Sequence, residues 1–182
     1  SLKIHYQDAL KFDWSQVPNQ LFIVGNLPYQ IASELMVQLV TAPVNFKSAV
    51  LMMQLEVAER AMALVNTKAY GRLSVLLQTQ LDFEVIVNVP PEAFKPPPKV
   101  QSQVIKLTPK PQPLCPPSQL HYLSLVTQTA FSKRRKKNSN AFEALFSLDV
   151  LKSCGIDPHQ RPQEVSIAGY LELAKILEKR GE

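Results

Sequence analysis

The sequence is poor in the residues that build disulfide scaffolds, metal clusters and phosphate-binding loops. Its two cysteines lie 39 positions apart and its three histidines are scattered, which argues against a disulfide-rich fold and against a metal site. None of the five glycines belongs to a Gly-x-Gly-x-x-Gly or Gly-x-x-x-x-Gly-Lys pattern. No apolar run reaches the roughly 20 residues that cross a bilayer. We therefore expect a cytoplasmic protein with no metal and no membrane partner.

Positive charge is abundant and unevenly placed. The net charge is +5, and residues 110–182 hold 11 Lys and Arg against 7 Asp and Glu. Five cations are consecutive, from Lys133 to Lys137. Such a run is often only a solvated helix end. The local excess nevertheless favours a polyanionic partner for the C-terminal third.

Strand and helix patterns alternate over the first 109 residues. Strands are expected at 3–6, 21–25, 49–54, 83–87 and 103–107, and helices at 31–41 and 55–65. This alternation predicts an α/β domain with a mainly parallel sheet covered on both faces and an antiparallel pair at one edge. A proline-rich linker at 110–117 then leads to a small all-helical domain over 118–182. Its last helix is expected to begin after Ser166 as the N-cap.

The most informative motif is Asn26-Leu27-Pro28-Tyr29, which follows an apolar strand pattern and precedes a helix. Open α/β sheets bind ligands at the carboxyl ends of their strands. Because proline extends the residue before it, the Asn26 side chain and the Leu27 carbonyl can point into one cleft as two acceptors. They can grip the amine of an extruded base on which Tyr29 stacks. The simpler interpretation is a helix start capped by Asn26.

Several motifs occur in an order typical of one enzyme family. They are Tyr-Gln-Asp-Ala-Leu (6–10), Val-Gly-Asn-Leu-Pro-Tyr (24–29), Gln-Leu-Glu-Val-Ala-Glu-Arg (54–60), Lys-Ala-Tyr-Gly-Arg-Leu-Ser-Val (68–75), Phe-Lys-Pro-Pro-Pro-Lys-Val (94–100) and Phe-Ser-Lys-Arg-Arg-Lys (131–136). The series resembles the bacterial adenine dimethyltransferases of small-subunit ribosomal RNA. The resemblance implies a Rossmann-like class I methyltransferase sheet, S-adenosylmethionine as cofactor, and transfer of methyl groups to N6 of two adjacent adenosines. These lie near the 3′ end of 16S rRNA in a pre-30S particle.

The same resemblance implies roles for particular residues. Asp8 and Asn26 would contact the cofactor, residues 26–29 would form the catalytic corner, and Tyr29 and Phe94 would hold the target base. The cations implied to contact RNA are Lys133, Arg134, Arg135, Lys136 and Lys137. Residues 70–72 are expected to shape the mouth of the pocket that holds the target base. The sequence departs from the family pattern at 137–138, where Lys-Asn replaces the usual Thr-Leu.

Family members also carry an upstream segment with a glycine-rich cofactor loop and two further strands. This sequence starts at what matches the third strand, so we expect an incomplete sheet and little cofactor binding by these residues alone. The strand at 3–6 would lie apart or would re-pair beside 21–25. Two alternatives stay open: a large-subunit RNA methyltransferase of the antibiotic-resistance type, and a non-catalytic subunit-assembly factor. We expect a monomer.

Overall fold

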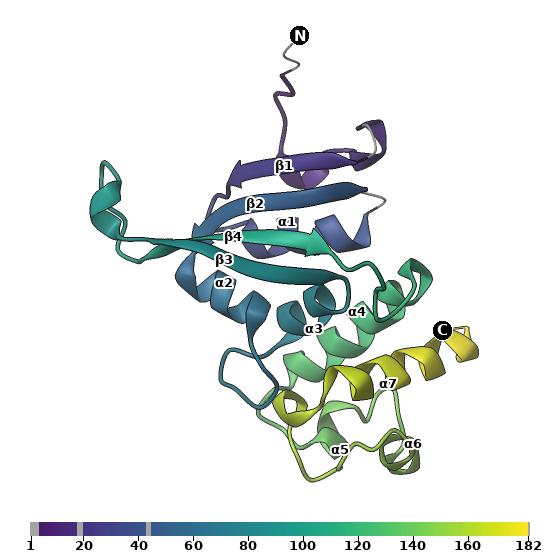
Figure 1. The fold of residues 1–182 in the computed structure, drawn as a ribbon. Helices are drawn as coiled ribbons and strands as arrows, with labels where there is room; N and C mark the ends of the chain where they lie inside the picture. Colours follow the sequence, from purple (N-terminus) through teal and green to yellow (C-terminus); the bar gives the residue numbers. More distant parts are fainter. Residues whose placement is uncertain (1–3, 18–19, 43–44, 182) are drawn as a thin grey trace.

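The computed structural model describes residues 4–17, 20–42 and 45–181, in which a mixed sheet lies against a group of helices (Figure 1). Its strands are β1 (Leu21–Asn26), β2 (Phe46–Gln54), β3 (Leu81–Val89) and β4 (Ser102–Pro109), in the order β1-β2-β4-β3. β1 and β2 are parallel, whereas β4 is antiparallel to both of its neighbours. The prediction of a mainly parallel sheet is wrong, because β4 returns directly from β3 without a crossover helix. The predicted antiparallel edge pair is confirmed.

Helices α1 (Ala32–Thr41), α2 (Leu55–Met62) and α3 (Arg72–Gln78) pack on one face of the sheet. In Figure 1, α1 lies behind the strands, and α2 and α3 lie below β3. On the opposite face, Phe22 is 73% exposed and Val24 is 83% exposed. Within the described ranges no helix covers that face, so cover on both faces is not found. α3 was not predicted from the sequence. Five consecutive residues of it are buried, so it lacks the polar stripe that marks an amphipathic helix.

The strand expected at 3–6 is not formed. Lys3 lies outside the described residues, and Ile4 to Tyr6 are exposed and belong to no strand. The short 3-10 helices η1 (Ala9–Lys11) and η2 (Trp14–Gln16) follow instead. In the described part of the chain β1 pairs only with β2, so the strand has not re-paired there either. An alternating pattern is not enough when no neighbouring strand accepts its backbone hydrogen bonds.

The C-terminal part is helical, as predicted. It contains α4 (Pro117–Ser132), α5 (Asn138–Ala141), α6 (Leu148–Ser153) and α7 (Ile167–Arg180). Long helices α4 and α7 pack side by side (Figure 1). Ser166 is the N-cap of α7, because its hydroxyl accepts the Gly169 amide at 3.1 Å. No helix of the described chain is long and apolar enough to cross a membrane.

Helix α3 joins the sheet to the helical part. Leu73 and Leu77 belong to the hydrophobic core beneath the sheet, whereas Val75 and Leu76 belong to the core formed by α4 and α7. The two cores therefore share one helix. This arrangement sets the position of the helical part relative to the strand ends, where the site lies.

Candidate active site

The turn between β1 and α1, formed by residues 26–29 and called the β1–α1 corner below, is fixed by its backbone. The Leu27 amide donates to the Met52 carbonyl of β2 at 2.9 Å. The Pro28 carbonyl accepts the Ile31 amide at 3.1 Å and so begins the helix. Proline restricts the backbone further. The corner is therefore a rigid turn at the carboxyl end of a strand, where the sequence predicted it.

The Asn26 side chain is not used to hold the fold. It is exposed and makes no hydrogen bond to another described residue. The N-cap position of α1 belongs to Ile31, which makes no side-chain cap. The simpler interpretation of Asn26 as a helix cap is therefore wrong. Its amide group is available to a ligand.

A cavity of about 370 Å³ opens beside the corner. Its second wall comes from the long connection between β3 and β4, which protrudes from the sheet in Figure 1. Its lining residues are Asn26, Leu27, Pro28, Tyr29, Phe94, Pro96 and Pro98. Tyr29 and Phe94 are both half-buried, and both line the cavity. The structure thus brings together the predicted corner and the predicted aromatic residue, 65 positions apart in sequence.

A second, apolar cavity of about 380 Å³ lies behind the corner and reaches the segment around Asp8. Gln7 and Ala9, the chain neighbours of Asp8, line it together with Gly25 and Leu27. Asp8 is exposed, and one carboxylate oxygen accepts the Leu10 amide at 3.0 Å as the N-cap of η1. Its other oxygen is left to accept a further donor.

Residues 70–72 do not shape this mouth, contrary to the prediction. Tyr70 is 1% exposed, and its hydroxyl donates to the Val165 carbonyl in the helical part. Burial raises the pKa of the Tyr70 phenol well above its ordinary range. Arg72 donates to the Ser124 hydroxyl at 2.8 Å. These residues attach the helical part to the α/β part instead.

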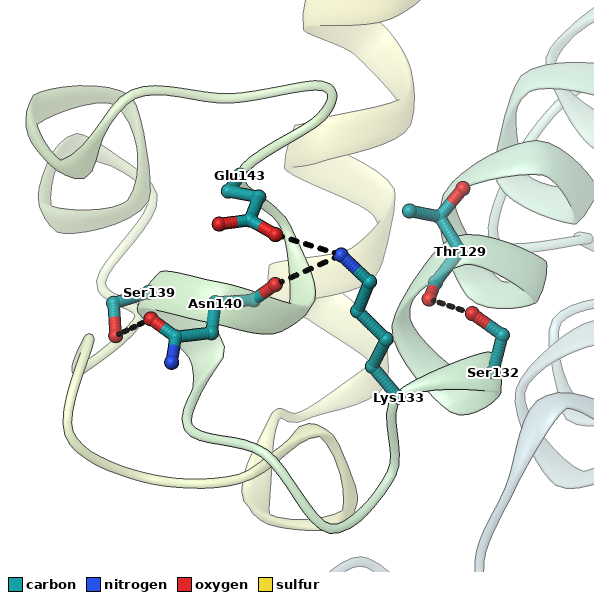
Figure 2. Close-up of polar contacts among 6 residues, drawn as sticks. All are labelled: Thr129, Ser132, Lys133, Ser139, Asn140 and Glu143. Atoms are coloured by element: carbon teal, nitrogen blue, oxygen red, sulfur yellow. Dashed lines mark hydrogen bonds and ion pairs between the residues drawn. The ribbon is translucent and has the colours of Figure 1, made fainter.

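The basic run after α4 is divided between internal and external positions. Lys133 turns back to the Glu143 carboxylate at 2.8 Å and to the Asn140 carbonyl at 3.4 Å (Figure 2). Arg134 donates to the Lys68 carbonyl and to the Gln163 side chain. The three remaining cations are exposed and make no ion pair or side-chain hydrogen bond with the described chain: Arg135, Lys136 and Lys137.

The departure from the family pattern has a structural explanation at position 138. Asn138 is buried and opens α5. Its backbone N–H donates to the Gln160 carbonyl at 2.7 Å, and its side-chain NH₂ donates to the Asp157 carbonyl at 2.9 Å. An asparagine thus satisfies the backbone of the loop before α7 at a position where leucine would supply only packing.

One feature was missed by sequence reasoning. A polar cleft of about 930 Å³ separates α2 from the helical part, and it is lined by Glu56, Glu59, Arg60, Lys68, Ala69, Arg134 and Gln163. Glu56 and Arg60 lie four positions apart on α2, a spacing that permits an ion pair, but none is formed between them within the described ranges. The signal in the sequence is the charged face of α2, whose side chains line this cleft.

Comparison with known proteins explains this arrangement. The family described as ribosomal RNA adenine dimethylase matches residues 1–179. The chain belongs to this family. A ribosomal RNA small subunit methyltransferase A from Janthinobacterium sp. (strain Marseille) is 42% identical over 180 residues, which cover 97% of this chain and 70% of the relative. The same-named protein of Cronobacter sakazakii (strain ATCC BAA-894) is 41% identical, over 97% of this chain and 66% of its own length.

Solved structures confirm the predicted methyltransferase fold. The crystal structure of a dimethyladenosine transferase from Plasmodium falciparum matches with a TM-score of 0.80 and 27% identity, over 97% of this chain and 72% of that one. The 23S rRNA methyltransferase ErmE matches with a TM-score of 0.65 and 23% identity, over 94% of this chain and 70% of that one. The second likeness concerns the fold alone. As a member of the dimethylase family, this chain belongs to enzymes that methylate ribosomal RNA with S-adenosylmethionine.

Proposed function

We propose that this chain recognises and orients the target adenosine in the S-adenosylmethionine-dependent N6,N6-dimethylation of two adjacent adenosines near the 3′ end of small-subunit ribosomal RNA. The substrate is the RNA of a pre-30S particle during ribosome biogenesis, and the protein acts as a monomer without a metal. The carrying observation is the cavity between the β1–α1 corner and Phe94, beside an Asn26 amide with no internal partner. The names of the most similar relatives support the small subunit as substrate.

The chemistry follows from the electronic structure of the base. The N6 amine of adenine is a weak nucleophile, because its lone pair is delocalised into the ring. The Asn26 side-chain oxygen and the Leu27 carbonyl accept its two hydrogens and localise that lone pair on nitrogen. Tyr29 and Phe94 hold the flipped-out ring between them. The oriented nitrogen would then attack the methyl group that S-adenosylmethionine supplies when it is bound, with the carbon–sulfur bond as the one broken, and the methylated amine would lose its proton to water.

The described residues suit the adenine end of the cofactor. S-adenosylmethionine supplies an electrophilic methyl group when it is bound. The apolar cavity beside Gly25 and Leu27 suits a flat purine, and the spare acceptor of Asp8 suits an exocyclic amine. Asn26 lines the cavity between the corner and Phe94, which is called the target pocket below. Its neighbours Gly25 and Leu27 line the apolar cavity, so Asn26 lies between the two. Asp8 and Asn26 are therefore the proposed cofactor contacts of this chain.

The basic run supplies affinity for the RNA backbone. Lysine and arginine contacts to phosphates release counterions, so binding weakens as salt rises. We assign the direct phosphate contacts to Arg135, Lys136 and Lys137, because these three side chains are free of internal ion pairs in the described chain. Lys133 and Arg134, also predicted as RNA contacts, hold the turn that presents them.

A methylation assay with located products tests the proposal. The full-length protein that carries this chain is incubated with S-adenosylmethionine and with small or large subunits lacking adenine methylation. Primer extension then maps the modified bases. We expect stops at two adjacent adenosines near the 3′ end of small-subunit RNA and none on large-subunit RNA. Modification of large-subunit RNA alone would favour the resistance-type alternative, and binding without methylation would favour an assembly factor.

A further inference from the structure

One hydrogen bond spans the two walls of the target pocket. The Tyr29 hydroxyl lies 3.2 Å from the Ser102 hydroxyl, 73 positions away in sequence. Tyr29 belongs to the β1–α1 corner, and Ser102 is the first residue of β4, directly after the connection that carries Phe94. The bond therefore joins the β1–α1 corner to the start of β4, where the connection that carries Phe94 ends.

Ser102 is a well-fixed anchor. It is 1% exposed, and its backbone pairs with Gln54 of β2 on one side and with Val89 of β3 on the other. The preceding carbonyl, that of Gln101, accepts the Leu55 amide at 2.9 Å. A short serine side chain on such a backbone has few positions available to its hydroxyl. Tyr29, half-buried and placed in a turn, has more freedom to lose.

We infer that Ser102 is a positioning residue, which holds the Tyr29 ring in the place where it stacks on the target adenine. This inference rests on the proposed function. Ser102 does not line the target cavity, so it acts through Tyr29 and not on the substrate. A tyrosine side chain that moves freely between χ1 rotamers would place its ring beside the base only part of the time. Fixing it in advance removes that ordering cost from the bound state.

Four variants of the full-length protein test this role: Ser102→Ala, Tyr29→Phe, the double variant, and Ser102→Thr. Loss of one hydrogen bond predicts a roughly three- to tenfold fall in kcat for Ser102→Ala and for Tyr29→Phe. We expect KM for small subunits to stay within twofold, because phosphate contacts dominate binding. The double variant should be no slower than either single variant, since both remove the same bond. Ser102→Thr, which keeps a hydroxyl, should recover most of the rate.

A matched control separates positioning from folding. Thr127 is buried in α4, and its hydroxyl donates to the Leu123 carbonyl at 2.7 Å, far from the corner. Thr127→Val should lower the melting temperature about as much as Ser102→Ala and leave kcat unchanged. Stacking is followed with 2-aminopurine at the target position of a short RNA. Its fluorescence should be quenched by the wild type and less so by Ser102→Ala.

The outcomes distinguish the two proposals. A wild-type protein that methylates no ribosomal RNA would remove the proposed function itself. An active wild type with unchanged kcat in Ser102→Ala and Tyr29→Phe would overturn the role of Ser102 alone. Additive losses in the double variant would also overturn it, because they would show that the two hydroxyls act separately.

Discussion

The β1–α1 corner and the basic turn at 133–137 use their polar side chains in opposite ways. At the corner the backbone and the Tyr29 hydroxyl make the structural contacts, and the Asn26 amide stays without an internal partner. In the basic turn two of the five cations are engaged with the protein itself, through Glu143 and Gln163 among others. A motif therefore does not reveal which of its members face a ligand. That depends on what else in the fold can satisfy each group.

The largest effect is expected at the corner. Asn26→Ala removes one of the two acceptors for the target amine, and loss of one such preorganised group typically costs on the order of 10²–10³-fold in kcat. Methyl transfer from tritiated S-adenosylmethionine to small subunits measures it. Asn45→Ala is the matched control, because Asn45 is an exposed asparagine at the opposite end of the same strands, beside Leu21. Equal activity of both variants would contradict the role of Asn26.

The next effect concerns the second wall of the pocket. Phe94→Ala removes a ring that lines the cavity. Stacking of a base on an aromatic side chain contributes about 1–3 kcal/mol, so we expect a fall of roughly five- to 160-fold in kcat/KM. Phe94→Tyr keeps the aromatic face and should retain most of the activity. If Phe94→Leu were as active as Phe94→Tyr, simple apolar filling and not stacking would be its contribution.

The five cations of the basic turn should fall into two groups, one whose removal weakens RNA binding and one whose removal lowers stability. The triple variant Arg135→Gln, Lys136→Gln, Lys137→Gln removes only exposed charges. We expect an unchanged melting temperature, weaker binding to small subunits, and a salt dependence of log K that is shallower by about 2 to 3. Filter binding at several salt concentrations measures this slope.

The complementary double variant, Lys133→Gln with Arg134→Gln, serves as the control for that experiment. It loses contacts to Glu143, Gln163 and the Lys68 carbonyl. We expect a loss of about 1 kcal/mol in the free energy of unfolding, because these contacts are partly exposed. A triple variant that binds as tightly as the wild type would refute the assignment of the exposed cations to RNA.

The sequence predicted best what local chemistry decides. A proline after a strand placed the β1–α1 corner, and Ser166 placed the start of α7, since both signals act within a few residues. The three strands β2, β3 and β4 were found from their apolar patterns, with ends differing by up to three residues. The prediction of a strand at 3–6 is wrong. A strand needs a neighbouring strand to pair with, and its own residues do not show whether one is present.

What the sequence could not predict depends on distant contacts. The inward turn of Lys133 and Arg134 requires partners 10 and 66 positions away. Tyr70 was predicted to line the mouth of the target pocket, but it is buried against the helical part, where its hydroxyl donates to the Val165 carbonyl. Helix α3 is buried over five consecutive residues, so its sequence lacks the helical alternation of polar and apolar residues that predicts a helix. In each case the decisive neighbour comes from another element, so local patterns carry no trace of it.

The smallest expected effect isolates the internal half of the basic turn. The hydrogen bond from Lys133, together with its charge, lowers the pKa of the Glu143 carboxyl. A carboxyl with a lowered pKa stabilises the fold above the ordinary glutamate range, and this contribution is lost as pH falls through the folded pKa. Glu143→Gln should therefore flatten the acid side of the plot of melting temperature against pH and leave the neutral side slightly lower. Glu172→Gln removes a similarly exposed pair with Lys175 in α7 and serves as the control. Because the Lys133–Glu143 pair holds the turn that presents the outward cations, Glu143→Gln should also bind small subunits slightly more weakly, and unchanged binding would show that this pair does not order the turn for RNA.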